Sequence, residues 1–429
     1  MNTGVSTVLN QIRVENVIKH KKVIHQTGLL FFSQIAALLI GILLKSIQTR
    51  GLGPEGYGLF AFFTSITAFT VLFFRFGLFS SVKVLLANNH DARKERELFG
   101  AGFVLAFLIG LLYSLLIFAI SFFVDGLFEV EIGSILRVAS PLCFILPFGF
   151  LINSLGVGSN RIGHTSTFTL LNKLFFLIPL GLAFYFYGLS VSHVIFLNLS
   201  AAILAVLVAG FMFNPSLSNQ VATVGGVLRK NRQFGIHLYT GQVADQAALQ
   251  FGGLLIAYFA GTTELGFYSL AVIMCMPIAL LSKSLSQSLF KGFAERDKVP
   301  LRVFLVNGVW LIGSMVFLVL FSKLIISFLF GNEFLTTARF VFPLALAGVL
   351  NGIYQPANDF IAVKGRGKWM RSNSIRMMVV TVVAGLILIP AYGAMGAAWT
   401  SVLGMATFAA SCFYYYAKSL KASSNRSEI

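Results

Sequence analysis

Residues 53–61 read GPEGYGLFA and residues 263–271 read TELGFYSLA, so a stretch rich in glycine and aromatic residues recurs, with Gly58 matched by Gly266 at an offset of 208. RVASPL at 137–142 is matched by RFVFPL at 339–344, and Tyr187-Gly188 is matched by Tyr392-Gly393, at offsets of 202 and 205. Three matches in one order at nearly one offset indicate an internal duplication. Many carriers form a substrate site between two duplicated halves.

The composition is that of an integral membrane protein. The 429 residues are 57% hydrophobic and 11% charged, whereas a soluble domain is about half apolar and about a quarter charged. A spanning helix needs about 20 mostly apolar residues, because backbone polar groups in hydrocarbon must be hydrogen-bonded within the segment. The apolar runs here are long and continuous, which favours helices over the alternating strands of a barrel.

The apolar runs predict an all-α integral membrane protein with twelve transmembrane helices. We expect two six-helix lobes around a central cavity, related by a pseudo-two-fold axis along the membrane normal. The predicted spans are 27–48, 58–80, 99–123, 136–157, 166–187, 193–213, 237–260, 266–288, 303–325, 339–361, 373–391 and 396–416. The predicted domains are an N-terminal segment (1–26), an N-terminal lobe (27–213), an inter-lobe linker (214–236), a C-terminal lobe (237–416) and a C-terminal tail (417–429).

The charge distribution predicts the topology. A net charge of +17 would suggest nucleic-acid binding in a soluble protein, but here the Lys and Arg residues cluster in predicted loops on one side. By the positive-inside rule we expect both termini and the linker to be cytoplasmic, and no nucleic-acid partner. The linker carries Arg229, Lys230 and Arg232 and is expected to include a short surface helix. The opposite loops are too short for a catalytic domain.

Two basic residues occupy equivalent positions in the two halves. Arg75 follows Gly58 by 17 residues, and Lys283 follows Gly266 by 17 residues, so the repeat predicts one depth for both. Such a pair is suited to a phosphate or pyrophosphate, because charge-assisted hydrogen bonds are strong at low dielectric. The alternative is that both side chains snorkel to the cytoplasmic headgroups.

Further cations lie in the first and fifth predicted spans. Lys173 lies deep in its span, and a charge at that depth is costly unless it faces a cavity or a partner, so we expect it to face the cavity. Lys45 and Arg50 lie near the outer end of the first span. They are predicted to be interfacial or gate residues.

Polar side chains form stripes along the seventh and tenth predicted spans. Amides both donate and accept hydrogen bonds, so such stripes suit carbohydrate hydroxyls, or a coupling role where a carboxylate is present. The alternatives are hydrogen bonds that hold the helices together, and a salt bridge for the carboxylate of the seventh span. The residues are Gln242, Asp245, Gln246, Gln250, Asn351, Gln355, Asn358 and Asp359.

The sequence carries no recognisable catalytic pattern. It has no phosphate-binding loop of the Walker type, no His/Cys spacing typical of a metal site and no Ser/His/Asp arrangement. Cys143, Cys275 and Cys412 each lie in an apolar run and are expected to be packing residues. We therefore predict a secondary transporter rather than an enzyme, with no catalytic residue, metal or cofactor.

Residues 50–58, RGLGPEGYG, resemble the signature hairpin of bacterial polysaccharide flippases in the multidrug, oligosaccharidyl-lipid and polysaccharide (MOP) exporter superfamily. ELGFY at 264–268, FGNEF at 330–334 and YGAMGAA at 392–398 support this resemblance. It implies two lobes around a cationic cavity that opens alternately to either side. Family members often have an aspartate at the position of Asp245.

The resemblance also implies a substrate. Flippases of the O-antigen type move oligosaccharides on undecaprenyl diphosphate from the cytoplasmic to the outer leaflet, for lipopolysaccharide O-antigen, capsule or exopolysaccharide. We therefore expect Arg75, Lys173 and Lys283 to contact the diphosphate, in the bacterial cytoplasmic (inner) membrane. Expected partners are membrane lipids, a polysaccharide polymerase and a chain-length regulator. The alternatives are a cation-coupled multidrug exporter of the same fold and a membrane polysaccharide polymerase or ligase.

Overall fold

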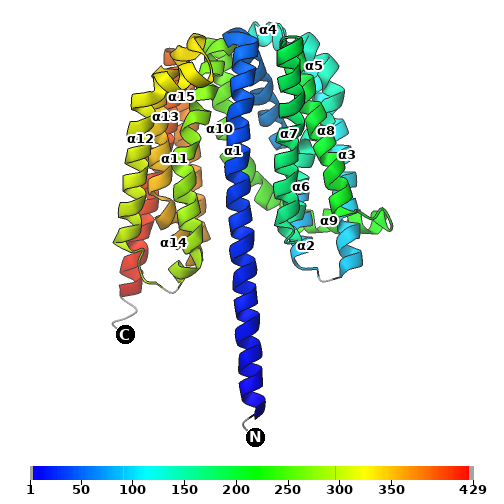
Figure 1. The fold of residues 1–429 in the computed structure, drawn as a ribbon, viewed down its shortest axis with the longest axis vertical. Helices are drawn as coiled ribbons and strands as arrows, with labels where there is room; N and C mark the ends of the chain where they lie inside the picture. Colours follow the sequence, from blue (N-terminus) through cyan, green and yellow to red (C-terminus); the bar gives the residue numbers. More distant parts are fainter. Residues whose placement is uncertain (1–2, 90, 295, 425–429) are drawn as a thin grey trace.

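The computed structural model describes residues 3–89, 91–294 and 296–424. It describes side chains from residue 36 on, except at several positions within 234–249 and 287–294 and after 420. These ranges contain no strand, which confirms the all-α prediction. In Figure 1, α1 stands between two groups of helices, α2 to α9 and α10 to α15.

The helices follow one another through short connections. The N-terminal half contains α1 (Thr3–Phe73), α2 (Leu78–Ala87), α3 (Ala92–Ile120), α4 (Val124–Phe128), α5 (Gly133–Ala139), the 3-10 helix η1 (Ser140–Ile145), α6 (Leu146–Gly158), α7 (Ile162–Phe186) and α8 (Val191–Phe213). The linker contains α9 (Gln220–Lys230) and the π-helix η2 (Asn231–Gly235). The C-terminal half contains α10 (Ile236–Ala260), α11 (Thr262–Ala294), α12 (Leu301–Leu329), the 3-10 helix η3 (Asn332–Thr337), α13 (Ala338–Ile353), α14 (Gln355–Val363) and α15 (Gly367–Ser424).

The two longest helices each contain a reversal of the chain. Gly53 in α1 has φ 65° and Gly393 in α15 has φ 57°, a region that glycine enters without the steric cost of a Cβ. Pro54 then begins the second leg of α1, where its missing N–H is not needed. As a result α1 begins and α15 ends at the same end of the molecule, the lower end in Figure 1.

The turns of the backbone repeat at the offsets seen in the sequence. Among the residues with positive φ, three pairs with one member in each half reproduce the three sequence offsets of 208, 202 and 205 residues. The three pairs are Gly53 with Gly261, Glu129 with Gly331, and Gly188 with Gly393. The duplication inferred from the sequence therefore extends to the conformation of the loops.

Nine segments of the described chain are long and apolar enough to cross a membrane. Two of them, Ala36–Phe73 and Gly367–Leu420, include the reversals at Gly53 and Gly393, and α2 and Gln250–Ala260 are shorter apolar helices. The number of twelve transmembrane helices stays a prediction. The predicted span 58–80 is not one helix, since the backbone breaks between α1 and α2, where Phe76 and Gly77 both have positive φ.

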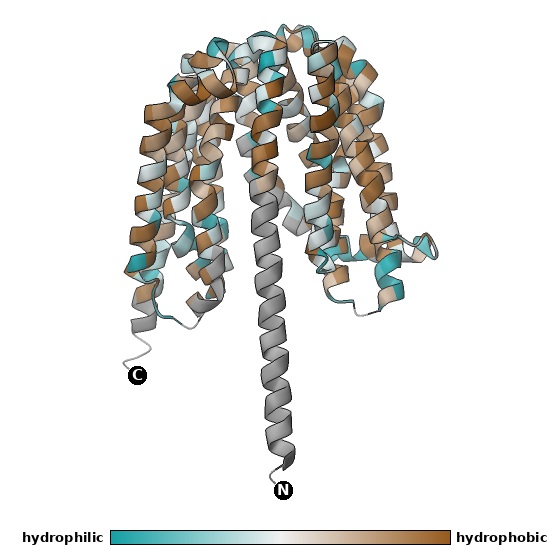
Figure 2. Cartoon of the chain, in the orientation of Figure 1, coloured by the Kyte–Doolittle hydropathy of each residue, from teal (hydrophilic) through white to brown (hydrophobic). Residues whose placement is uncertain are grey.

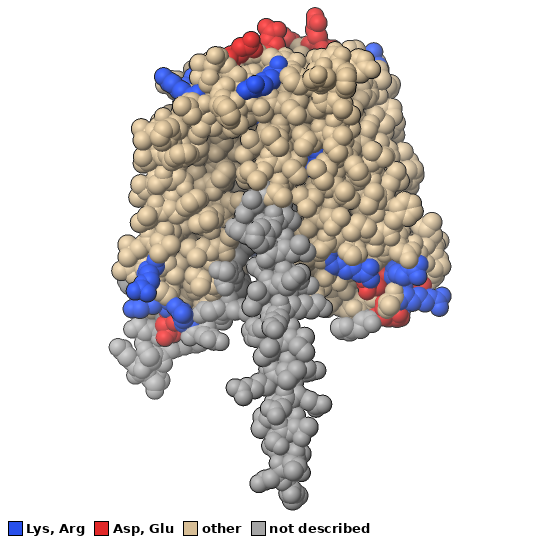
Figure 3. Space-filling view, in the orientation of Figure 1, with Lys and Arg blue, Asp and Glu red and all other residues tan. Residues whose placement is uncertain are grey.

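The surface has the banded pattern of a multi-pass membrane protein. Figure 2 shows brown, hydrophobic residues along the middle of the long helices and more hydrophilic residues toward their ends. In Figure 3 the coloured charges on the visible face gather at the two ends, with an almost uncharged band between them. Because charges in hydrocarbon are costly, this band marks the part of the surface that fits the bilayer core.

At the upper end the two halves meet through two glycines. A Cβ on Gly58 would lie 2.5 Å from the backbone oxygen of Thr262, and a Cβ on Gly266 would lie 3.0 Å from the Cα of Gly58. The ring of Phe334 packs edge-on against Tyr57, with 5.9 Å between the ring centroids. The stretches that show the repeat in the sequence are therefore in contact with each other.

Replacing Gly58 with alanine tests this contact. The new methyl group has no room beside the Thr262 carbonyl, so the helices must separate, at a cost of about 1–3 kcal/mol. We expect G58A to lower the midpoint of thermal unfolding of the purified protein in detergent.

Gly308 in α12 provides the matched control, because a Cβ there meets no atom within 4 Å. Alanine in an open helical position stabilises by up to about 1 kcal/mol relative to glycine, so G308A should keep or raise the midpoint. Equal midpoints for the two variants would contradict the close packing at Gly58.

Candidate functional site

A cavity of about 480 Å³ lies between α1 and α7 of the first half and α11 of the second. Seven of its nine lining residues are uncharged and two are lysines. The lining residues are Ala37, Leu38, Gly41, Ile42, Lys45, Lys173, Ile273, Met276 and Leu280. The cavity is therefore an apolar space between the two halves that contains two cations.

Lys45 is held against aromatic rings of its own hairpin. Its Nζ lies 5.2 Å from the ring centroid of Tyr57 and 5.0 Å from that of Phe60, both on the second leg of α1. A cation over a ring face is attracted by the ring quadrupole, and the attraction is larger where water is excluded. The reversal at Gly53 therefore brings the two legs of α1 together and places the Lys45 ammonium beside the two rings.

Lys173 reaches the same cavity from α7. Its Nζ donates a hydrogen bond to the Ala37 backbone oxygen, and it lies 3.1 Å from the place where a Cβ of Gly41 would be. Gly41 thus leaves room for the ammonium beside α1, one turn before Lys45. Lys173 thus lines the same cavity as Lys45, and its predicted role in substrate binding stays a prediction.

No carboxylate neutralises these two cations within the described side chains. The ion pairs found there are Arg93–Glu97, Arg161–Glu95 and Arg339–Glu264, and none includes Lys45 or Lys173. Two like charges in an apolar space cost stability. An anion placed between them would remove this cost.

Arg75 lies outside the lining of this cavity, in the break between α1 and α2. Its Nη1 donates a hydrogen bond of 3.0 Å to Oε1 of Gln246 on α10, and its guanidinium lies 4.1 Å from the ring centroid of Phe150. The structure thus joins two of the predicted site residues, Arg75 and Gln246, in one contact between the halves.

The environment of Lys283 differs from that of Arg75. Lys283 lies in the uninterrupted helix α11, exposed, three residues after Leu280 of the cavity lining. No hydrogen bond or ion pair is found for Lys283 within the described part of the chain. The repeat therefore does not give the two cations equal surroundings, because only the first half breaks its helix at this point.

The polar residues of the predicted tenth span bond mainly within the C-terminal half. Gln355 donates from Nε2 to Oδ1 of Asn351 over 3.1 Å, and the Ser286 hydroxyl donates to Oδ2 of Asp359 over 2.6 Å. Oδ1 of Asn358 is buried without a partner among the described residues. These bonds correspond to the alternative that the stripe holds helices together.

The remaining predicted site residues lie apart from the cavity. Arg50 donates from Nη2 to the backbone oxygen of Phe328 over 2.5 Å, which joins α1 to α12 at the upper end. Gln250 is exposed on α10. The side chains of Gln242 and Asp245 lie outside the described residues, so their predicted roles stay predictions.

Sequence reasoning missed the aromatic partners of Lys45 and the space left by Gly41. The helical spacing of Ala37, Gly41 and Lys45, four residues apart, was the available signal, because it places a small residue one turn before a cation on one face. The described side chains contain no group of three or more His, Cys, Asp or Glu residues that could hold a metal ion.

Residues 23–290 match the model of the polysaccharide biosynthesis protein family. The chain belongs to this family. Most of the first half, the linker and the cavity wall on α11 fall within the matched range. No curated protein matches this sequence.

Solved structures of the MOP superfamily share its fold. The lipid II flippase MurJ, in an inward closed conformation, is similar over 91% of this chain and 87% of its own, with a TM-score of 0.71 and 17% identity. An inward-facing multidrug resistance transporter of the MATE family is similar over 90% and 95%, with a TM-score of 0.70 and 15% identity.

A third relative of this fold is a MOP superfamily transporter from Pyrococcus furiosus, for which a binding pocket of reversed polarity is described. It is similar over 93% of this chain and 95% of its own, with a TM-score of 0.58 and 14% identity. Identities this low show the fold alone. With the family match they confirm the resemblance stated from the sequence motifs.

Lys173→Met tests whether the uncompensated charge in the cavity costs stability. Methionine has a similar length without the ammonium, so the repulsion from Lys45 disappears and the apolar lining becomes continuous. We expect the midpoint of thermal unfolding in detergent to rise, corresponding to about 1 kcal/mol or more, as is common where function requires a destabilised site.

The control is Lys323→Met at an exposed position of α12, which should leave the midpoint unchanged. A lower midpoint for K173M would mean that the hydrogen bond to Ala37 stabilises the protein more than the charge destabilises it. That result would contradict the claim that two like charges in the cavity lower the stability of the protein.

Proposed function

We propose that this polysaccharide biosynthesis protein is a flippase for a lipid-linked oligosaccharide, with undecaprenyl diphosphate as the carrier lipid. The single observation that carries the proposal is the pair Lys45 and Lys173, which share an apolar cavity between the two halves and have no carboxylate partner among the described side chains. The family match and the fold shared with a lipid II flippase support it.

The diphosphate group provides the negative charge that the two cavity lysines lack among the described side chains. Two ammonium groups in an apolar space attract an anion with two phosphates, and hydrogen bonds between ionised partners are stronger than neutral ones. The aromatic rings of Tyr57 and Phe60 keep the Lys45 cation stable while the cavity is empty of substrate. Transport requires no covalent chemistry, because the cavity only has to open alternately toward each leaflet.

Other residues of the predicted site take supporting roles in this proposal. Lys283, exposed on α11 near the cavity, offers a further cation for the diphosphate. Arg75 joins the two halves through Gln246 and is released for substrate when that contact opens. The amides of Gln250 and of the stripe on α13 and α14 offer donors and acceptors for sugar hydroxyls.

The proposed setting is the bacterial cytoplasmic membrane, with both termini in the cytoplasm. The substrate then crosses from the cytoplasmic to the outer leaflet for O-antigen, capsule or exopolysaccharide synthesis. A polysaccharide polymerase and a chain-length regulator are the proposed partners, since they use such a product on the outer side.

Replacing the cavity lysines tests the proposal directly. In cells we expect K45Q and K173Q each to reduce surface polysaccharide at equal protein level, and K45Q/K173Q together to abolish it. In proteoliposomes the same variants should lose translocation of the lipid-linked oligosaccharide. The physical reason is the loss of two charge-assisted contacts, each worth about 1.5–3 kcal/mol.

Lys323→Gln on α12 is the control for the loss of a cation elsewhere in the protein, and it should transport normally. Full polysaccharide output from the double cavity variant would contradict the proposed role of the two lysines.

A cation-coupled drug exporter is the second candidate, favoured by the similarity to the MATE fold and by the half-buried carboxylate of Asp359. An exporter of this kind depends on a carboxylate that binds and releases the coupling cation. If the chain is a flippase instead, D359N should keep polysaccharide output within about twofold, since amide and carboxylate both accept from Ser286. Loss of drug resistance in D359N, with unchanged polysaccharide, would favour the exporter.

A further inference from the structure

The linker between the halves forms a helix that lies across the ends of the spanning helices. Figure 1 shows α9 running sideways beside α2, near the lower end of the molecule, whereas α3, α7 and α8 run lengthwise. The helix has 11 residues and packs against α2 and α3. Its place is therefore the boundary between the apolar band and the charged end.

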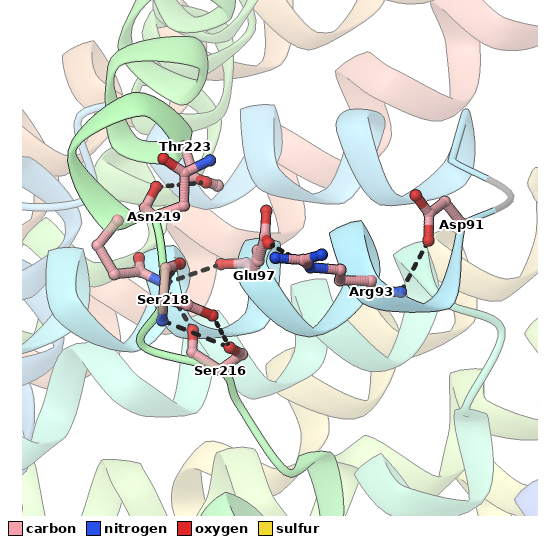
Figure 4. A network of polar contacts seen from close by, with 8 residues as sticks. Asp91, Arg93, Glu97, Ser216, Ser218, Asn219 and Thr223 are labelled. Carbon is pink, nitrogen blue, oxygen red and sulfur yellow. Dashed lines mark hydrogen bonds and ion pairs between the residues drawn. The ribbon is translucent and has the colours of Figure 1, made fainter.

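Hydrogen bonds fix the beginning of α9 on α3. The Ser216 backbone N–H donates to the backbone oxygen of Arg96 over 2.9 Å, and Gln220 donates from Nε2 to the backbone oxygen of Glu97 over 3.3 Å. Figure 4 shows the polar contacts around the beginning of α9, with Ser216, Ser218 and Asn219 from the linker and Arg93 and Glu97 from α3. A Cβ on Gly100 would lie 2.0 Å from the Ser216 oxygen, so the linker approaches α3 closely.

The helix is also fixed after its last turn. Asn231 donates from Nδ2 to the backbone oxygen of Phe76 over 3.0 Å, and it accepts a hydrogen bond of 3.1 Å from the Ser81 hydroxyl. A Cβ on Gly77 would lie 2.3 Å from the backbone oxygen of Gly235. Because both ends are attached to the N-terminal half, α9 cannot turn to bury a different face.

With this orientation, α9 leaves an apolar flank uncovered. Val227 is completely buried against the protein, whereas Val221 is 92% exposed and Leu228 is 44% exposed. These two exposed residues are seven apart, so they share one side of the helix. Leu217, in the turn just before α9, is 69% exposed.

Basic side chains lie next to this flank. Arg229, directly after Leu228, and Arg232, four residues after it, are both exposed, and Lys83 on α2 is exposed as well. In Figure 3 blue side chains gather at the lower right end, with red side chains among them, where α2, α3 and α9 lie in Figure 1. A basic amphipathic helix parallel to the membrane binds acyl chains with its apolar face and anionic headgroups with its basic residues.

We propose that α9 binds the surface of the membrane leaflet at the lower end of the molecule, inserting Val221, Leu228 and Leu217 between the lipids. Arg229 and Arg232 contact anionic headgroups beside them. This contact holds the N-terminal half at a fixed depth while the other half moves. It depends on anionic phospholipid and not on the transported substrate.

Labelled cysteines measure the depth of the flank. V221C carries an environment-sensitive fluorophore on the apolar flank, and G226C carries it five residues later on the far side, where a Cβ meets no atom within 4 Å. Cys143, Cys275 and Cys412 are buried, so the introduced thiols react selectively in the folded protein. The full-length protein is placed in vesicles of phosphatidylcholine with or without phosphatidylglycerol.

In vesicles with phosphatidylglycerol we expect brominated lipids to quench the label at V221C several-fold more than the label at G226C, and aqueous iodide to show the reverse. R229Q/R232Q in the V221C background should reduce the lipid quenching, most clearly at low phosphatidylglycerol content. Equal iodide access at both positions would overturn the proposal and would indicate a water-exposed surface or a soluble protein partner. Lipid quenching at V221C that changes neither with the phosphatidylglycerol content nor with R229Q/R232Q would overturn the headgroup contact.

Discussion

In a bilayer a backbone carbonyl that leaves a helix finds no water to bond with, so every interruption of a spanning helix needs a partner from the protein. The break between α1 and α2 shows how this protein meets the requirement. The Tyr239 hydroxyl donates to the backbone oxygen of Phe73 over 2.8 Å, and Asn231 donates to that of Phe76. The donors come from the linker and from α10, so the break in the first half is completed by residues of the linker and of the second half. This dependence joins the two halves at the lower end, while the contact of Gly58 with Thr262 joins them at the upper end.

Between these two contacts lies the cavity with Lys45 and Lys173. Its position follows from the reversal at Gly53, which places two aromatic rings beside one ammonium, and from Gly41, which leaves space for the other. The cavity therefore depends on the same glycine-rich hairpin that carries the family resemblance. In the proposed function a bound anion neutralises these charges, so the site would be one in which stability is lost for the sake of function.

The sequence was sufficient for the features that repeat. The offsets of 208, 202 and 205 indicated an internal duplication, and positive-φ residues occur at the same offsets. It was insufficient where the halves differ. A hydropathy pattern does not reveal the break after Phe73, because Phe74 and Phe76 continue the apolar run although the helix has ended. Equal depth for Arg75 and Lys283 assumed two continuous helices, and only α11 is continuous. Lys45 was predicted to be an interfacial or gate residue, because helical spacing alone does not show which other element a helix faces.

The central claim is that the cavity recognises a diphosphate, and a binding comparison in nanodiscs tests it most directly. A polyprenyl diphosphate and the polyprenyl alcohol of the same chain length share the apolar tail and differ only in charge. The account predicts that the diphosphate binds much more tightly to the wild-type protein, and that K45M/K173M removes this difference while leaving the alcohol unaffected. Equal affinity of the wild-type protein for both compounds, or an undiminished preference for the diphosphate in K45M/K173M, would contradict it.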